Sequence, residues 1–267
     1  MSLLTVKNVK KIYTTRFGSV KVQALNDVNF SVEEGEYVAI MGESGSGKTT
    51  LLNILASLDT ATSGQVLLNG QELSKVSQKD LCAFRRDHLG FVFQDFNLLD
   101  TMSLRDNIFL PLVLAGMPYR EMEERLLPLA RKLAIADILD KYPYEVSGGQ
   151  KQRAAVCRAL ITDPDIVLAD EPTGALDSRA SGKLLKLFGE INGEGQTILM
   201  VTHSIQAAAH AGRVLFIKDG RVFHQIYRGE RNRDEMYRMI SDALTVMQAQ
   251  DGQEYAAGDG MDAEGQA

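Results

Sequence analysis

A glycine-rich segment between two apolar runs constrains this chain more than any other feature. Gly42-Glu43-Ser44-Gly45-Ser46-Gly47-Lys48-Thr49, followed by Thr50, fits the pattern G-x4-G-K-[ST]. It follows the strand-like residues 37–41 and precedes a helical apolar spacing over 48–58, which is the context a phosphate-binding loop requires. Glycines let backbone N–H groups close around a β-phosphate at a helix N-terminus. We expect Lys48 to bridge the β- and γ-phosphates and the Thr49 hydroxyl to bind Mg²⁺. A glycine-rich turn with an exposed lysine is the simpler alternative.

Two adjacent carboxylates end an apolar run later in the chain. Asp170 and Glu171 follow residues 166–169, which read as a buried strand. Ligands of open α/β sheets bind at the carboxyl ends of parallel strands. We therefore expect Asp170 to hold Mg²⁺ through water and Glu171 to act as general base toward the attacking water. Without the phosphate loop, a strand running into an acidic turn would be the better interpretation.

The hydrophobic pattern divides the chain into three parts. Strand-like runs at 4–9, 28–32, 37–41 and 65–68 predict a small, partly antiparallel sheet at the front. The middle, about 95–160, is mostly helical: helices are expected from Ser103, over 119–135 and from Ser147, with Pro128 kinking or breaking the second. Apolar strands at 166–169 and 197–202, separated by a helix near 178–191, predict a parallel sheet covered on both faces.

Charge and composition limit the function classes. The net charge is −6, which disfavours general nucleic-acid binding, but residues 248–267 carry five acidic and no basic residues. The other 247 residues hold 29 basic and 30 acidic side chains and are nearly neutral. We expect 248–267 to be a disordered acidic tail. Two distant cysteines, Cys82 and Cys157, form no disulfide framework, and no apolar run approaches the ~20 residues of a membrane span.

Ser147-Gly148-Gly149-Gln150 opens the third predicted helix. Ser147 and Gln150 have the spacing of a capping box, so a plain helix start is one interpretation. Capping does not need two adjacent glycines. They are useful where a backbone must approach a ligand closely, and a helix N-terminus favours an anion.

Residues 146–150 (Val-Ser-Gly-Gly-Gln), between the phosphate loop and Asp170-Glu171, resemble the signature of ABC ATPases, and the resemblance spans residues 3 to about 225. Further matches follow one another along the chain in the order that the family has them. Tyr13 resembles the aromatic residue that stacks on adenine, and Gln94 resembles the glutamine that joins the Mg²⁺ site to the helical subdomain. Residues 175–177 (Ala-Leu-Asp) resemble the loop that crosses the dimer, and His203 the switch histidine at the γ-phosphate. Val146 departs from the usual leucine, a conservative change.

The resemblance implies an α/β fold: a P-loop ABC ATPase cassette over 1–247, with a mostly parallel core sheet, an antiparallel β subdomain and a helical subdomain at about 95–160. It also implies ATP and Mg²⁺ as ligands and a head-to-tail homodimer. In that dimer, each nucleotide lies between the phosphate loop of one protomer and residues 147–150 of the other. Glu171 and His203, with Lys48 and Gln94, would then support hydrolysis.

The resemblance further implies a partner, a separate membrane permease. In the family, the region of Phe96-Asn97-Leu98-Leu99 receives a permease helix, although such a tetrapeptide can also be core. Residues 93–99 and 171–177 resemble the branch of lipoprotein-release, macrolide-export, peptide-resistance and cell-division ATPases. Residues 99–104 and 110–112 look most like its bacitracin-type peptide-resistance members. The expected location is the cytoplasmic face of the membrane, as a peripheral subunit.

Two other functions stay open at this stage. A soluble ABC-type ATPase acting on ribosomes or nucleic acid would carry a second cassette, an inserted arm or a basic face, and none is evident. The arginines of 228–238 alternate with acidic residues, as on a solvated helix. We therefore expect no direct nucleic-acid partner. A non-hydrolysing regulatory cassette is disfavoured because Glu171, His203 and the signature are intact.

Overall fold

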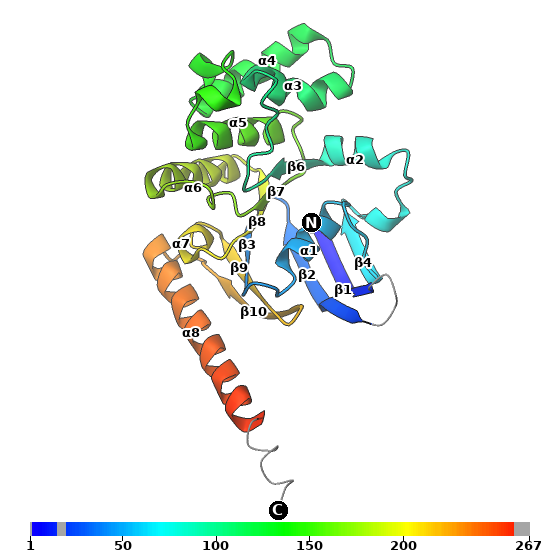
Figure 1. Cartoon of the computed structure of the whole chain (residues 1–267), viewed down its shortest axis with the longest axis vertical. Helices are drawn as coiled ribbons and strands as arrows, with labels where there is room; N and C mark the ends of the chain where they lie inside the picture. Colours follow the sequence, from blue (N-terminus) through cyan, green and yellow to red (C-terminus); the bar gives the residue numbers. More distant parts are fainter. Residues whose placement is uncertain (1, 15–19, 259–267) are drawn as a thin grey trace, which may run out of the picture.

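The computed structural model describes residues 2–14 and 20–258, with side chains placed through Met247. Two sheets and a helical layer make up this part of the chain (Figure 1). The strands are β1 (Ser2–Thr14), β2 (Lys21–Glu33), β3 (Tyr37–Met41), β4 (Ser63–Leu68), β5 (Gln71–Glu72), β6 (Leu89–Val92), β7 (Ile166–Asp170), β8 (Thr197–Val201), β9 (Arg213–Lys218) and β10 (Arg221–Tyr227). The α-helices are α1 (Lys48–Leu55), α2 (Leu81–His88), α3 (Leu104–Leu114), α4 (Tyr119–Lys132), α5 (Gly148–Leu160), α6 (Ser178–Gly193), α7 (Ile205–Ala208) and α8 (Arg233–Gly258).

The core sheet has the order β10-β9-β3-β8-β7-β6, and all its pairings are parallel except β9 with β10. The second sheet, β2-β1-β4-β5, is antiparallel. Both predicted sheets are therefore present. Assigning residues 37–41 to the front sheet was wrong, because β3 pairs with β8 and β9. All five of its residues are buried, as expected of a strand covered on both faces.

Alternate residues of the core strands feed two hydrophobic clusters. On β3, Tyr37, Ala39 and Met41 face the cluster shared with α3–α6 and α8, whereas Val38 and Ile40 face the cluster shared with α1 and the antiparallel sheet. This two-sided burial follows from the period-2 direction of strand side chains. It fixes the parallel strands in register, so the loops that follow β3, β6, β7 and β8 emerge at one edge.

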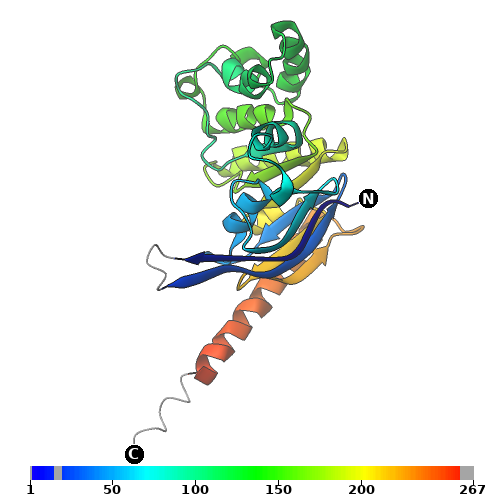
Figure 2. The same ribbon diagram turned by 90° about the vertical axis from the view of Figure 1, so that its right-hand side faces the viewer.

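Helices α3, α4 and α5 lie together at one end of the molecule, and α8 projects from the other end (Figures 1 and 2). Pro128 was predicted to kink or break helix α4, and the break is wrong, because the helix continues through it. Its apolar face of Met122, Leu126 and Ala130 is buried, and this packing outweighs one missing N–H. Helix α1 ends at Leu55, before the predicted residue 58.

The acidic tail was predicted to begin at residue 248, but α8 extends to Gly258. The remainder of that predicted tail, 259–267, lies outside the described residues. Cys82 is exposed, Cys157 is buried, and neither forms a disulfide. Within the described residues, no helix combines the length and the apolar character needed to span a bilayer.

Candidate nucleotide-binding site

The predicted phosphate loop connects β3 to α1, and its glycines are required by the structure. Gly47 caps α1 with a φ of 98°, in the left-handed region, and Gly45 has a φ of 81°. A Cβ on Gly47 would lie 2.3 Å from the Ala24 carbonyl oxygen, and one on Gly42 only 2.2 Å from that of Ile217. The loop is therefore wedged between β2 and β9. Only glycine fits at both positions.

Lys48 starts α1 and turns back over the loop. Its Nζ donates to the carbonyl oxygens of Gly42, at 2.8 Å, and Glu43, at 2.6 Å. Partial burial lowers the pKa of Lys48, and the nearby carboxylates of Glu171 and Asp170 oppose that shift. The structure thus places the predicted lysine and both predicted carboxylates in one electrostatic environment.

Asp170 ends β7 with its carboxylate half-buried. Burial, followed by the charge of Glu171, raises the pKa of Asp170, and Lys48 compensates only in part. An ionised carboxylate in this position is therefore short of positive charge. Asp170, Thr49 and Gln94 carry carboxylate, hydroxyl and amide oxygens, which are the types of ligand that Mg²⁺ prefers. In their chemistry these residues fit a divalent cation.

Glu171 is the best-anchored side chain of the site. Its backbone is left-handed, with a φ of 44°, and its N–H donates to the Val201 carbonyl at 2.9 Å. The carboxylate accepts hydrogen bonds from Thr202 Oγ1 at 3.0 Å and the His203 N–H at 2.8 Å. His203 Nδ1 also lies 2.8 Å from it. The ends of β7 and β8 thus bring together the carboxylate and histidine that the sequence predicted, and they add Thr202.

Gln94 follows β6 and lies against the loop after Glu171. A Cβ on Gly174 would come within 2.9 Å of Gln94 Cδ, so the missing side chain at 174 makes room for this glutamine. Gln94 is therefore in contact with the chain segment that follows β7.

Residues 147–150 begin α5 and form the capping box. Gln150 N–H donates to Ser147 Oγ at 3.3 Å, and Ser147 N–H donates to Gln150 Oε1 at 2.8 Å. A Cβ on Gly149 would lie 3.1 Å from that of Ala180 in α6, whereas one on Gly148 would meet nothing closer than 3.7 Å. Packing against Ala180 explains the glycine at position 149, whereas no neighbour within the described residues requires a glycine at position 148. No hydrogen bond found in that part of the chain joins this segment to the phosphate loop.

Tyr13 lies near the end of β1 and is 42% exposed. Its hydroxyl donates to Asp59 at 2.8 Å, and the Lys11 ammonium is 4.8 Å from the ring centroid. These contacts fix the ring on the surface of the antiparallel sheet. Tyr13 does not line the cavity described next.

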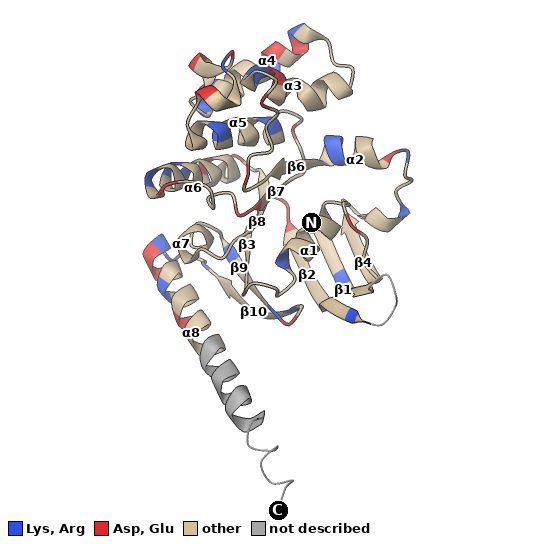
Figure 3. Cartoon of the chain, in the orientation of Figure 1, with Lys and Arg blue, Asp and Glu red and all other residues tan. Residues whose placement is uncertain are grey.

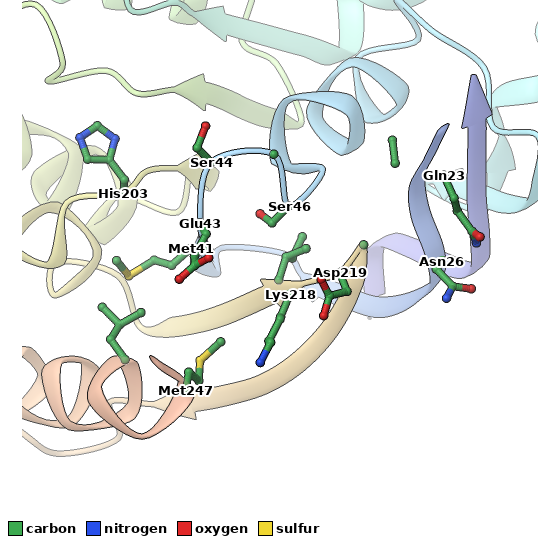
Figure 4. A pocket seen from close by; sticks show the side chains of 16 residues that line it. Gln23, Asn26, Met41, Glu43, Ser44, Ser46, His203, Lys218, Asp219 and Met247 are labelled. Carbon is green, nitrogen blue, oxygen red and sulfur yellow. The ribbon is translucent and has the colours of Figure 1, made fainter. Parts of the chain in front are cut away.

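A cavity of about 960 Å³ lies beside the phosphate loop (Figure 4). Glu43, Ser44 and Ser46 border it on the loop side, and His203 lies at one rim. Met247 of α8 lies across from the loop, next to Lys218 of the β9–β10 hairpin. Residues 42–46 of the predicted loop therefore line a hollow large enough for a small ligand, whereas Lys48, Asp170 and Glu171 are not among its lining residues. Sequence reasoning had not included α8 or the hairpin in it.

The predicted permease-binding segment has mixed burial. Leu98 packs against the core, whereas Leu99 is 48% exposed. Phe96 and Asn97 are both left-handed, with φ of 63° and 49°. Arg158 of α5 donates to the carbonyl oxygens of both. The segment is thus neither plain core nor a loose loop, since α5 fixes its backbone at the surface.

Sequence reasoning missed Thr202, Gln152 and Arg158 as site residues. Gln152 is fully buried and bonds to the loops that hold Gln94 and Glu171. Its signal was a polar residue on an otherwise apolar stripe of α5 with Val156 and Ala159. Thr202 had a weaker signal, as the polar residue between an apolar strand and His203.

Basic and acidic residues are both spread along the ribbon in Figure 3, and helix α4 carries both signs. This mixture gives no support to the strongly basic face expected of a protein that reads the phosphate backbone of nucleic acids.

Comparison with known proteins shows the family to which the chain belongs. The chain is 50% identical to YvcR of Bacillus subtilis, an uncharacterized ABC transporter ATP-binding protein, over 92% of this chain and 95% of YvcR. It is 45% identical to the bacitracin export ATP-binding protein BceA of Halalkalibacterium halodurans, over 92% of this chain and 97% of BceA. Among solved structures, it resembles the dimeric post-hydrolysis state of the ATP-binding cassette MJ0796 bound to ADP and Pi. That likeness has a TM-score of 0.76 and 38% identity, over 84% of this chain and 98% of that one. The ABC transporter family profile matches residues 25–174, and the chain belongs to the ABC transporter family.

Proposed function

We propose that this protein is the ATP-hydrolysing subunit of an ABC transporter and that it drives a separate membrane permease. One observation carries the hydrolytic part: the ends of β3, β7 and β8 bring Lys48, Glu171 and His203 to one edge of the sheet. Phosphoryl transfer to water requires positioning and charge neutralisation more than covalent chemistry. These residues supply a cation for the phosphates, a carboxylate for the water and a histidine beside it.

Within this proposal, Glu171 is the general base and His203 the γ-phosphate contact. The hydrogen bonds from Thr202 and from the His203 backbone hold the Glu171 carboxylate in one orientation. A base so oriented can accept a proton from a water in line with the γ-phosphate. Tyr13 is proposed to stack on adenine.

Thr49, Gln94 and Asp170 are proposed to hold Mg²⁺. This ion would neutralise charge on the β- and γ-phosphates when ATP is bound. The half-buried Asp170 carboxylate, whose pKa is raised by burial and by Glu171, supports this part of the proposal.

The signature segment serves a second copy of the chain. Residues 147–150 form no hydrogen bond to the phosphate loop of their own chain within the described residues, and the matched MJ0796 structure is dimeric. In the proposed head-to-tail dimer, Ser147 and Gly149 donate to the γ-phosphate held by the partner's Lys48. ATP then closes the dimer, and hydrolysis releases it.

The transported substrate is proposed to be an antimicrobial peptide, on the basis of the BceA-like relative and the resemblance of residues 99–104. The permease is proposed to contact the surface around Leu99, placing the subunit peripherally at the cytoplasmic face of the membrane. Relatives named as transporter ATP-binding proteins favour this function over an ATPase acting on ribosomes or nucleic acid.

The Glu171→Gln variant tests the proposal. It keeps the shape of the side chain but removes the base, so we expect ATP binding, a loss of turnover of at least about 100-fold, and a stable dimer in ATP. Glu190→Gln, on the exposed face of α6, is the matched control and is expected to behave as wild type. Normal turnover in Glu171→Gln would overturn the base assignment. Co-purification of the native complex with ribosomes or DNA, without a membrane protein, would overturn the transport assignment.

A further inference from the structure

One buried amide connects the signature helix to both catalytic loops of its own chain. Gln152, in α5, is 0% exposed. Its Nε2 donates to the carbonyl oxygen of Phe93 at 3.1 Å and to that of Pro172 at 2.7 Å. Phe93 directly precedes Gln94, and Pro172 directly follows Glu171. Both protons of the amide are therefore used on the backbones of the two loops.

Packing alone does not account for a glutamine here. Its neighbours on the same stripe of α5 are Ala155, Val156 and Ala159, all buried and apolar. A methionine has nearly the same shape and would bury no amide. A buried polar side chain needs hydrogen-bond partners. The Gln152 amide nitrogen has two, both on catalytic loops, whereas its Oε1 has none within the described residues. The feature that distinguishes Gln152 from an apolar residue is thus its pair of donors.

A second side chain of α5 also donates hydrogen bonds to the loop after β6. Arg158 donates to the Phe96 carbonyl at 3.0 Å and to the Asn97 carbonyl at 2.5 Å. The loop after β6 is therefore bonded to α5 on both sides of Gln94. Of these two side chains, Gln152 is the one that also donates to the loop after β7, so its amide joins three segments of the chain.

We propose that Gln152 is a positioning residue that couples the two nucleotide sites of the dimer. This inference rests on the proposed function, in which Ser147 acts on the partner's nucleotide while Gln94 and Glu171 act on the chain's own. Nucleotide that orders the two loops in one protomer fixes α5 through Gln152. It thereby fixes Ser147, five residues earlier, for the site of the other protomer.

The test compares Gln152→Met with Gln196→Met. Gln196 is the matched control because its Nε2 also donates to two backbone carbonyls, those of Pro164 and Thr197, away from the phosphate loop. For Gln152→Met we expect a kcat roughly 10- to 100-fold lower, as for the loss of two buried hydrogen bonds. The Hill coefficient for ATP should fall toward one, and the affinity of the isolated protomer for a fluorescent ADP should stay within about three-fold. Gln196→Met should keep both the rate and the cooperativity.

Rates are normalised to the fraction of protein that binds fluorescent ADP, so a loss of folded protein does not imitate the effect. A second measurement uses the ATP-trapped dimer: Glu171→Gln combined with Gln152→Met should need at least about ten-fold more ATP for half-dimerisation than Glu171→Gln alone. Wild-type cooperativity in Gln152→Met, or equal losses in both methionine variants, would overturn the coupling role. A wild-type protein that neither hydrolyses ATP nor dimerises would instead overturn the proposed function, and the coupling with it.

Discussion

Replacing Gly148 with alanine tests whether this glycine is needed for the start of α5 or for the close approach of a ligand. An alanine Cβ at this position meets nothing closer than 3.7 Å, the distance to Leu176 Cδ2 and to Phe96 Cζ. Gly148 is the first residue of α5, and its φ is outside the left-handed region. The isolated chain therefore accommodates the methyl group. Because alanine loses less backbone entropy than glycine in a helix, we expect stabilisation of up to about 1 kcal/mol.

The same substitution should be severe for activity. In the proposed dimer, the methyl group would lie between the start of α5 and the γ-phosphate at the partner's phosphate loop. Losing one well-placed backbone donor to a developing charge typically costs roughly 100- to 1,000-fold in kcat. We expect a loss in that range together with a failure to dimerise on ATP. The midpoint of thermal unfolding without nucleotide should rise by about 1–4 °C.

Thermal unfolding, steady-state ATP hydrolysis and sedimentation with ATP measure the three effects. Gly189→Ala, in α6, is the control, since a Cβ there meets nothing within 4 Å. It should raise the unfolding midpoint and leave hydrolysis unchanged. A Gly148→Ala protein that hydrolyses ATP at the wild-type rate would refute the argument that this glycine makes room for a ligand.

Three further outcomes follow from the site. Gly174→Ala should change the free energy of unfolding by less than about 1 kcal/mol, because the flexible Gln94 side chain can move away from the new methyl group. Displacing that amide should lower kcat and raise the Mg²⁺ concentration needed for half-maximal hydrolysis. An unchanged Mg²⁺ dependence in hydrolysis assays would contradict this. Asp170→Asn should raise the unfolding midpoint of the nucleotide-free protein at pH 7. The pKa of Asp170 is raised above 3.8 in the folded state, so the folded protein loses stability as the pH rises from 3.8 through that pKa and the carboxyl ionises. A neutral amide does not ionise and keeps this stability. A lower unfolding midpoint in calorimetry would refute the sign. Gly42→Ala should reduce the yield of folded protein, since its Cβ would lie 2.2 Å from a backbone oxygen of β9, and normal expression with a wild-type unfolding midpoint would count against the wedged loop.

Local patterns were enough for the parts of the site that lie within single segments. The loop at 42–50 and the carboxylates after β7 were predictable because each is a short pattern at the end of an apolar strand. The partners of β3 were not, since a fully buried strand carries no sign of which strands flank it. Gln152 and Thr202 act through contacts 20 or more residues away along the chain, which no local period encodes. The unbroken helix at Pro128 reflects tertiary packing that outweighs a local preference.

The position of Lys48 bears on how quickly the site exchanges its nucleotide. Its ammonium group is held by two carbonyl oxygens of its own loop, so an incoming phosphate displaces internal ligands as well as water. When the product leaves, the lysine can re-form its hydrogen bonds to the same carbonyls, so its half-buried charge is not left without partners. We therefore expect these two carbonyls to compete with phosphate for the lysine, and so to weaken the retention of ADP as well as the capture of ATP.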